Sequence, residues 1–326
     1  MISKNIKSRL KIIEGKLQNH TFPPQIVIEN TSYCNQRCIH CSHRELIRPK
    51  RHMNRGLWDK IVEEISRVSP QTEIWPTFYG EALIMGKNDE LWGRIDYAGR
   101  VGCKNLVLNS NGMLLDRWDN MDRILTSPLK RFILSLDGFS KEVYEKIRVG
   151  GKRDKVYAQV EQLLRLKQER NQLYPVIICQ FSEMDENRHE IPQYSHYWKS
   201  HGAEIKVRPK LEWTATGTVR SSFIVHDTGF RIACPWGNNT MAIHQDGRVV
   251  TCAVDYEGMH TVGNINNISV QEAWDRLDEQ VRKVHRERRW EDLPEICKGC
   301  GDWQTAGASY EEESIEGTRP FWWYDD

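Results

Sequence analysis

The sequence predicts an α/β fold, namely a partial (β/α)6 barrel followed by a small C-terminal α+β domain. The first observation is that short apolar stretches alternate with amphipathic helical stretches from about residue 25 to residue 209. Such alternation is typical of βαβ units around a parallel sheet. The second is that the alternation then stops, and a hairpin pattern and a separate helix follow. We therefore expect an N-terminal arm at residues 1–24, a barrel at 25–213, and a C-terminal domain with a tail at 214–326.

Six strands are expected in the barrel region, because six short runs are rich in Val, Ile, Leu and Phe. They occupy residues 26–29, 72–78, 105–108, 132–136, 176–181 and 205–207. Between them, apolar residues recur at helical spacing, as at Leu57, Ile61 and Ile65. A further expected helix carries Leu114, Leu115, Trp118, Met121 and Leu125. Ligands of such folds bind at the carboxyl ends of the strands, so candidate site residues should follow these runs.

The C-terminal region no longer shows the alternation of strand and helix patterns. Residues 215–217 are expected to form a linker, and residues 241–251 a hairpin whose turn is Asp246-Gly247. Residues 270–284 have a helical pattern, and the tail at 310–326 mixes acidic and aromatic residues. These elements predict the small α+β domain.

Composition excludes several protein classes. The 326 residues are 39% hydrophobic and 28% charged, which is enough for a sizeable core and unlike a disordered chain. The net charge is +1, from 46 basic and 45 acidic residues, so no charge excess attracts nucleic acid or an anionic membrane. No apolar run approaches the roughly 20 residues that span a bilayer. The N-terminus lacks a secretory signal pattern, so we expect a cytoplasmic protein without nucleic-acid or membrane partners.

Seven of the nine cysteines fall into two groups, which favours metal binding over disulfides. The first group, Cys34, Cys38 and Cys41, has the spacing C-x3-C-x2-C and directly follows the first expected strand. Three thiolates on one loop can hold three irons of a [4Fe–4S] cluster and leave the fourth iron free for a small molecule. The alternative is zinc, with His40 or His43 as the fourth ligand.

With this motif, residues 25–209 resemble the radical S-adenosylmethionine (SAM) superfamily. The resemblance implies that His40 lies near the adenine and that Gly80 and Glu81 belong to the loop that receives the methionine amino group. The family motif there is Gly-Gly-Glu-Pro, whereas this chain has Tyr79-Gly80-Glu81-Ala82 and so departs at its first and last positions. Further strand-end residues similar to cofactor contacts of the family are Asn111, Ser135, Asp137 and Arg148. Arg148 can bind a carboxylate with two hydrogen bonds, and Ser135 and Asp137 can bind ribose hydroxyls.

The second group consists of Cys234, Cys252, Cys297 and Cys300. Four thiolates suit a closed [4Fe–4S] cluster and a structural zinc ion equally well. The order Cys-Pro-Trp, Gly-x4-Cys and C-x2-C resembles the auxiliary-cluster domains called SPASM and twitch. No cysteine follows Cys300, so the resemblance implies one auxiliary [4Fe–4S] cluster and a C-terminal iron–sulfur domain.

Cys103 and Cys179 lie outside both groups and are interpreted as buried, inert cysteines. Cys179 is a weak candidate for the hydrogen donor that some radical epimerases use. Its neighbour Gln180 is expected to face the cofactor, which would turn Cys179 toward the helices. No other catalytic residue can be assigned from the sequence.

The resemblance implies an enzyme that reductively cleaves SAM to a 5′-deoxyadenosyl radical, which removes a hydrogen atom from its substrate. A flavodoxin- or ferredoxin-like partner would supply the electron. An all-cysteine auxiliary cluster has no open position, so its natural role is to accept an electron from the substrate radical. We therefore expect dehydrogenation of a small polar substrate, as in the aminocyclitol dehydrogenase of antibiotic biosynthesis, with Trp236 or Trp303 available to stack on a sugar ring.

Three alternatives remain at this point. A carbohydrate epimerase or decarboxylase would share the architecture. A peptide maturase often carries an N-terminal leader-binding domain of about a hundred residues, whereas about 24 residues precede the first strand here. A zinc-stabilised binding protein with two metal modules would be no enzyme, and it would be colourless where an iron–sulfur protein is brown.

Overall fold

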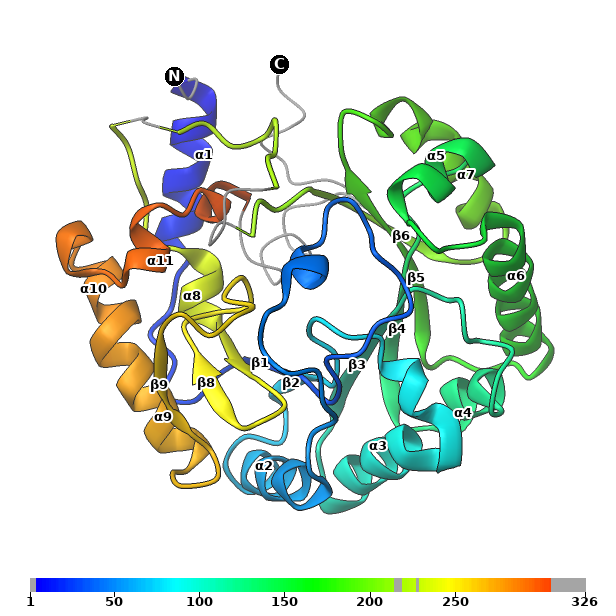
Figure 1. Cartoon of the computed structure of the whole chain (residues 1–326), viewed down its shortest axis with the longest axis horizontal. Helices are drawn as coiled ribbons and strands as arrows, with labels where there is room; N and C mark the ends of the chain where they lie inside the picture. Colours follow the sequence, from blue (N-terminus) through cyan, green and yellow to red (C-terminus); the bar gives the residue numbers. More distant parts are fainter. Residues whose placement is uncertain (1–3, 214–218, 227–228, 306–326) are drawn as a thin grey trace.

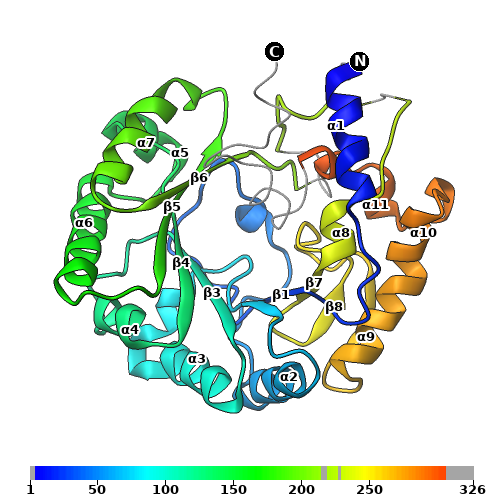
Figure 2. The same cartoon turned by 180° about the vertical axis from the view of Figure 1, so that it is seen from behind.

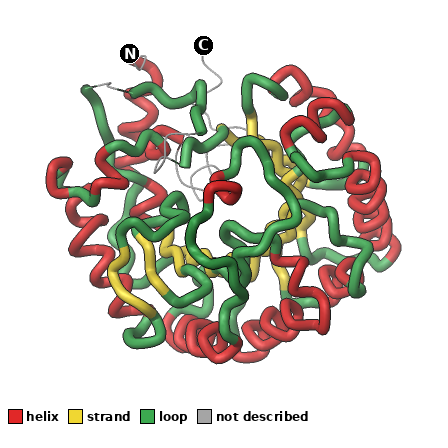
Figure 3. Tube along the Cα trace, viewed as in Figure 1, coloured by secondary structure: helices red, strands yellow, loops and turns green. Residues whose placement is uncertain are grey.

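The computed structural model describes residues 4–213, 219–226 and 229–305, and its centre is an open sheet surrounded by helices (Figure 1). The six expected barrel strands are present and pair in parallel, in sequence order. Figure 3 shows them as an arc with the helices on its outer side. The strands are β1 (Gln25–Ile28), β2 (Glu73–Trp75), β3 (Asn105–Ser110), β4 (Leu129–Ser135), β5 (Val176–Glu183) and β6 (Glu204–Pro209).

The sheet does not end at β1. Its order is β6-β5-β4-β3-β2-β1-β7-β8-β9, so the C-terminal strands extend the barrel sheet. β7 (Thr240–Ile243) pairs in parallel with β1, from Gln25 opposite Thr240 to Ile28 opposite Ile243. β8 (Arg248–Val250) and β9 (Thr261–Asn264) continue it in antiparallel. All four residues of β1 are buried, because the strand has a neighbour on each side.

The expected hairpin is confirmed, but its relation to the barrel was not anticipated. Gly247 has a φ of 89° in the turn, a conformation that glycine adopts without cost. The mainly parallel sheet with an antiparallel extension agrees with a partial barrel followed by α+β structure. The domain boundaries at residues 24 and 213 stay predictions.

The two faces of the sheet differ in chemistry. The outer face is covered by helices (Figure 2). It packs against them through a large apolar core that includes Trp58, Trp92 and Trp198. On the inner face, Val107, Ile133 and Ile178 form an apolar layer with Trp75 beside it. The helices that cover the barrel strands are α2 (Arg55–Val68), α3 (Glu90–Val101), α4 (Asn120–Thr126), α5 (Lys141–Ile147), α6 (Arg153–Glu169) and α7 (Ile191–Ser200).

One helix prediction was wrong in its extent. Leu114, Leu115 and Trp118 precede α4, because Trp118 and Asp119 have left-handed backbones with φ of 51° and 57° that a helix cannot contain. α5 was not predicted at all. The helical pattern at 270–284 is confirmed as α9 (Val270–Leu277), a π-helical turn η4 (Asp278–Arg282) and α10 (Lys283–Arg286).

The N-terminal arm forms a helix, α1 (Lys4–Gly15), that lies beside α8 (Pro235–Asn239) and α11 (Glu295–Lys298) in both views. Its Leu10 is fully buried against Ile232 and Trp303. Glu14 Oε1 accepts a hydrogen bond of 2.8 Å from the Ala233 amide. The two ends of the described chain therefore pack together.

The expected linker at 215–217 and the tail at 310–326 lie outside the described residues. Among the residues that the structure describes, no helix combines the length and the apolar character needed to cross a bilayer.

Candidate active site

A cavity lies at the carboxyl ends of the barrel strands, and it collects most of the residues that the sequence singled out. Cys34, Cys38 and Cys41 line it. So do seven of the eight expected cofactor contacts, namely His40, Gly80, Glu81, Asn111, Ser135, Arg148 and Gln180. The cavity also receives side chains from β6 and from the C-terminal region, including Arg208, Lys210 and Trp236.

The three cysteines lie on the loop that follows β1, and backbone hydrogen bonds hold this loop to the end of α5. The Arg37 amide donates to the Val149 carbonyl at 2.8 Å, and the Ile39 amide donates to the Ile147 carbonyl at 3.0 Å. Burial raises the pKa of the Cys34 and Cys41 thiols to about 12, and Glu81 acts in the same direction on Cys34. Metal binding at this loop must therefore release protons from neutral thiols.

The loop after β2 packs directly on the cysteine loop. The Glu81 amide donates to the Tyr33 carbonyl at 2.8 Å. The Glu81 carboxylate accepts from the Ser110 hydroxyl and the Asn111 amide, each at 2.8 Å, which fixes it to the end of β3. Asn111 in turn donates to Asn35 Oδ1 at 2.7 Å. The ends of three neighbouring strands are thus joined around Cys34.

Gly80 is required by the close approach of these two loops. A Cβ at this position would overlap the carbonyl group of Thr31 and lie 2.9 Å from the carbonyl oxygen of Tyr33. Both obstacles are backbone atoms, so no side chain can move aside.

We expect Gly80→Ala to destabilise the protein by about 1–3 kcal/mol, because an extra carbon in a packed backbone contact forces the loops apart. SAM affinity, measured by equilibrium dialysis of the reconstituted protein, should fall with it. Gly15→Ala is the matched control, since nothing lies within 4 Å of a Cβ there. Equal SAM affinity and stability in the two variants would contradict this role.

Asp137 is the one expected cofactor contact that does not line the cavity. It is fully buried, has a left-handed backbone (φ 59°), and binds Arg148 through its carboxylate. The same carboxylate lies 3.3 Å from His40 Nε2 and accepts a 2.7 Å hydrogen bond from the Ser182 amide. In this arrangement Asp137 orients Arg148 and His40, and the ribose contact expected of Asp137 stays a prediction.

Arg148 lies between this carboxylate and the cysteine loop. Its guanidinium is 3.7 Å from Cys38 Sγ, and Asp137 raises the Arg148 pKa although burial opposes this. Burial lowers the pKa of His40 to about 4. Asp137 opposes this shift, and Arg148, Lys210 and Arg208 add to it. His40 is therefore neutral at physiological pH.

Polar side chains near the carboxyl ends of β3, β4 and β5 are hydrogen-bonded to one another. The Ser135 hydroxyl donates to Asn109 Oδ1 at 3.1 Å, and Gln180 Nε2 donates to the Ser135 oxygen at 3.4 Å. As expected, Gln180 faces the cavity. Cys179 points the other way into the helix-facing core and is fully buried, so its thiol has no access to the cavity and cannot deliver hydrogen there. Cys103 is also buried, with its thiol 3.3 Å from the Val62 carbonyl.

The second cysteine group lines a separate, small apolar cavity. Cys234, Cys252, Cys297 and Cys300 all face it. Arg231 donates to the carbonyls of Cys297 and Lys298, at 2.5 and 3.1 Å, and so holds the C-x2-C turn in place. Burial raises the pKa of the Cys297 thiol to about 12. The start of α8, the segment after β8 and the C-x2-C turn thus bring together four thiols from distant parts of the sequence.

The wall between the two cavities includes consecutive residues of the chain. Cys252 lines the second cavity, and the next residue, Ala253, lines the first. Tyr79 donates to the Ala253 carbonyl at 3.3 Å, and its ring packs edge-on against Trp213. Trp213 Nε1 donates to the His40 carbonyl at 2.8 Å. Tyr79, which stands where the family motif has its first glycine, therefore belongs to this wall.

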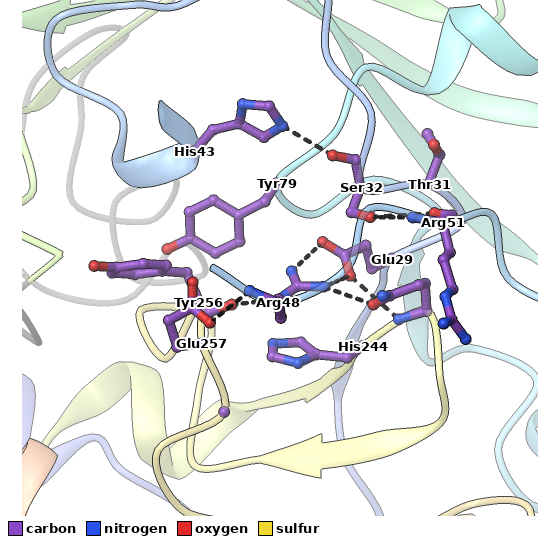
Figure 4. Close-up of polar contacts among 12 residues, drawn as sticks. Glu29, Thr31, Ser32, His43, Arg48, Arg51, Tyr79, His244, Tyr256 and Glu257 are labelled. Carbon is purple, nitrogen blue, oxygen red and sulfur yellow. Dashed lines mark hydrogen bonds and ion pairs between the residues drawn. The ribbon is translucent and has the colours of Figure 1, made fainter. Parts of the chain in front are cut away.

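A buried ion pair ties the segment after the cysteine loop to the C-terminal region (Figure 4). Arg48 binds both carboxylate oxygens of Glu29, at 2.6 and 2.7 Å. It also donates to the Tyr256 carbonyl at 2.7 Å and to Gln245 Oε1 at 2.6 Å. Burial raises the pKa of the Glu29 carboxyl, and Arg48 lowers it by a smaller amount.

The first cavity suits SAM and a cluster chemically. Three soft thiol ligands lie on one of its walls. His40 Nδ1 and Arg148 Nε are buried there without a hydrogen-bond partner among the described residues. Buried donors without partners are costly, which is what a site that awaits a polar ligand shows.

The comparison with protein families agrees with this chemistry. A model of the radical SAM superfamily matches residues 28–191, which is half of the chain. This chain belongs to the radical SAM superfamily. A second model, SPASM, described as an iron-sulfur cluster-binding domain, matches residues 234–301 and includes all four C-terminal cysteines. This radical SAM protein therefore binds SAM and a [4Fe–4S] cluster, and its SPASM region implies auxiliary iron–sulfur binding.

Curated relatives match part of the radical SAM protein. GTP 3′,8-cyclase of Clostridium botulinum is 28% identical over 137 residues, which is 42% of each chain. The match thus spans less than half of the length of these relatives.

Solved structures share the fold over most of the chain. The crystal structure of BtrN in complex with AdoMet and 2-DOIA has a TM-score of 0.61 at 17% identity, covering 87% of this chain and 94% of BtrN. SuiB of Streptococcus suis bound to its precursor peptide SuiA has a TM-score of 0.67 at 13% identity, covering 91% and 73%. At such identities the likeness establishes the fold alone.

Sequence reasoning missed several residues of the site. Arg208 and Lys210 follow the alternation Lys-x-Arg-x-Lys at the end of the sixth strand, and this pattern was available. Of the two tryptophans considered for sugar stacking, Trp236 lines the cavity, whereas Trp303 does not and packs against α1. No pattern in the sequence predicts the ion pair between Arg48 and Glu29.

Proposed function

We propose that this radical SAM enzyme dehydrogenates a small polar substrate, such as an amino sugar or aminocyclitol, with the auxiliary site as electron acceptor. The observation that carries the proposal is that two consecutive residues, Cys252 and Ala253, line the two different cysteine-lined cavities. It puts a second redox site beside the place where a substrate would react. The overall likeness to BtrN, crystallised with 2-DOIA, supports a substrate of this class.

Each group of site residues would bind a different part of the cofactors. Cys34, Cys38 and Cys41 would hold the first cluster, and Cys234, Cys252, Cys297 and Cys300 the auxiliary one. Arg148, fixed by Asp137, would bind the carboxylate of SAM, and the loop at Gly80 its amino group. When bound, SAM and its cluster would supply the radical that removes a hydrogen atom from the substrate.

The remaining steps remove a proton and an electron from the substrate. After loss of a hydrogen atom, the substrate must release one proton and one electron to complete the oxidation. The electron would pass across the wall to the auxiliary site. Glu81 has both carboxylate oxygens engaged by hydrogen bonds, so it holds the strand ends rather than accepting that proton.

We expect Cys297→Ala to separate the two half-reactions. SAM cleavage should continue at a reduced rate, because the first cluster loop is intact. Oxidised product should fall below detection, because the acceptor site has lost a ligand. Chromatography of 5′-deoxyadenosine and mass spectrometry of the substrate in the same anaerobic reaction check both parts. Loss of cleavage and product in equal measure would contradict an acceptor role.

A second candidate is peptide modification, since SuiB bound to the precursor peptide SuiA shares the fold. Incubation with amino sugars, aminocyclitols and peptides, each followed by mass spectrometry in deuterated buffer, distinguishes the candidates. A product lighter by the mass of H2 indicates oxidation. An unchanged skeleton with deuterium uptake indicates epimerisation of a carbohydrate or a peptide.

A further inference from the structure

The last barrel strand presents a row of cations to the inner face of the sheet. Along β6, Ile205 and Val207 belong to the helix-facing core, so the alternate residues Lys206, Arg208 and Lys210 face inward. Arg208 and Lys210 line the cavity. Positive charge therefore gathers on the wall that the substrate would share with the C-terminal region.

These two cations lack a direct ion-pair partner among the described residues, although Arg208 is close enough to Asp302 to lower the pKa of that carboxyl. Neither side chain forms an ion pair there, and the contact recorded for Arg208 is the ring face of Trp236, with Cζ 5.4 Å from the ring centroid. Glu81, the one carboxylate among the described residues that line the cavity, binds Ser110 and Asn111 instead.

Nearby carboxylates outside the lining are also engaged. Asp137 binds Arg148 and the Ser182 amide. Asp302 is 2% exposed and accepts hydrogen bonds from the amides of Glu212 and Trp213, at 2.8 and 3.2 Å. Partly desolvated cations without a partner are unfavourable, and a bound anion would remove that cost.

The position of this pair differs from that of Arg148. Arg148 contacts Cys38 and Asp137 at the cysteine loop, where the methionine part of SAM would bind. Arg208 and Lys210 come from the end of β6, and Arg208 lies on Trp236 of the C-terminal region. The cavity thus carries positive groups from two different elements, the end of α5 and the end of β6.

We propose that Arg208 and Lys210 form a subsite for an oxyanion carried by the substrate, either a phosphate ester or a carboxylate. This inference rests on the proposed function, because it assigns the substrate to the cavity beside SAM. The planar guanidinium can donate two parallel hydrogen bonds, and contact with Trp236 fixes its orientation. Lys210 adds a second charge. An amino group on the same substrate would be repelled by this wall and would have to lie elsewhere.

The test is equilibrium dialysis of radiolabelled inorganic phosphate with the holoenzyme and SAM under anaerobic conditions. The parent protein should bind phosphate about tenfold more tightly than the double variant Arg208→Gln/Lys210→Gln, since two charge-assisted contacts are lost. The double variant Arg208→Lys/Lys210→Arg keeps both charges and should recover most of the affinity. Equal affinity of the parent and the glutamine variant, or no binding by the parent, overturns the subsite.

The matched control is Arg67→Gln/Lys199→Gln, which removes the same charge from exposed positions on α2 and α7. It should bind phosphate as the parent does. SAM affinity is measured on all variants. If the glutamine variant at 208 and 210 loses SAM affinity as strongly as phosphate affinity, the pair serves SAM and the substrate subsite is overturned. Failure of the parent to form 5′-deoxyadenosine with dithionite would instead contradict the proposed function.

Displacement of bound phosphate distinguishes the two sources of the oxyanion. D-glucose 6-phosphate and D-glucuronate represent the phosphate ester and the carboxylate, and D-glucose is the neutral reference. The anion that displaces phosphate more strongly identifies the class. If neither anionic sugar displaces more phosphate than glucose does, the assignment of this subsite to a substrate is overturned.

Discussion

Replacement of Cys34 by alanine is expected to abolish SAM cleavage. Cys34, Cys38 and Cys41 line one cavity on a single loop, and two thiolates cannot hold three irons of a [4Fe–4S] cluster. The purified variant should lack about four irons per chain relative to the parent, with the auxiliary site still loaded. Chromatographic detection of 5′-deoxyadenosine after dithionite reduction, together with iron and sulfide analysis, checks the result.

The control for this experiment is Cys103→Ala. Cys103 is buried beside the Val62 carbonyl and lines neither cysteine cavity, so its loss should leave the iron content and cleavage unchanged. A Cys34 variant that cleaves SAM at the parental rate would show that the first site is assigned wrongly.

Arg48→Met should produce the largest loss of stability among the variants considered. The substitution leaves Glu29, which is fully buried, without its bidentate partner and also removes donors to Gln245 and the Tyr256 carbonyl. Breaking a buried pair on one side costs about 3–5 kcal/mol. Guanidinium unfolding of the anaerobically reduced protein measures the free energy of unfolding.

An exposed ion pair provides the comparison. Arg55 and Asp59 pair at 2.7 Å on the surface of α2, and Arg55→Met should cost less than about 1 kcal/mol. The double variant Arg48→Met/Glu29→Leu removes both charges and should recover much of the lost stability. A cost at Arg48 no greater than that at Arg55 would show that the buried pair does not hold the two regions together.

The sequence specified most of the barrel because its strands and helices carry strong local patterns. The six strand runs are apolar and the helices amphipathic, and spacing alone grouped the cysteines. Where local patterns are weak or misleading, prediction failed. The leucines at 114 and 115 suggested a helix, but the left-handed backbone of Trp118 and Asp119 delays the helix to Asn120.

Long-range partnerships were beyond sequence reasoning. The residues around Gln25 and Thr240 do not indicate that β1 and β7 pair. Each is a short apolar strand, and such a strand could pair with many others. The same holds for the pairing of Arg48 with Glu29 and for the bond between Asp137 and Arg148. Expected contacts at strand ends lined the cavity because parallel strands bring their carboxyl ends to one edge of the sheet.

The pairing of β1 with β7 has a consequence for how the protein matures. β1 leads directly into the loop of Cys34, and one of its edges bonds to residues that the ribosome adds only after the whole barrel region. A nascent chain that ends before Ile243 leaves that edge open, and Arg48 still lacks Tyr256. We therefore expect the first cysteine loop to reach its final structure, and to accept iron, only after β7 and Tyr256 have been synthesised.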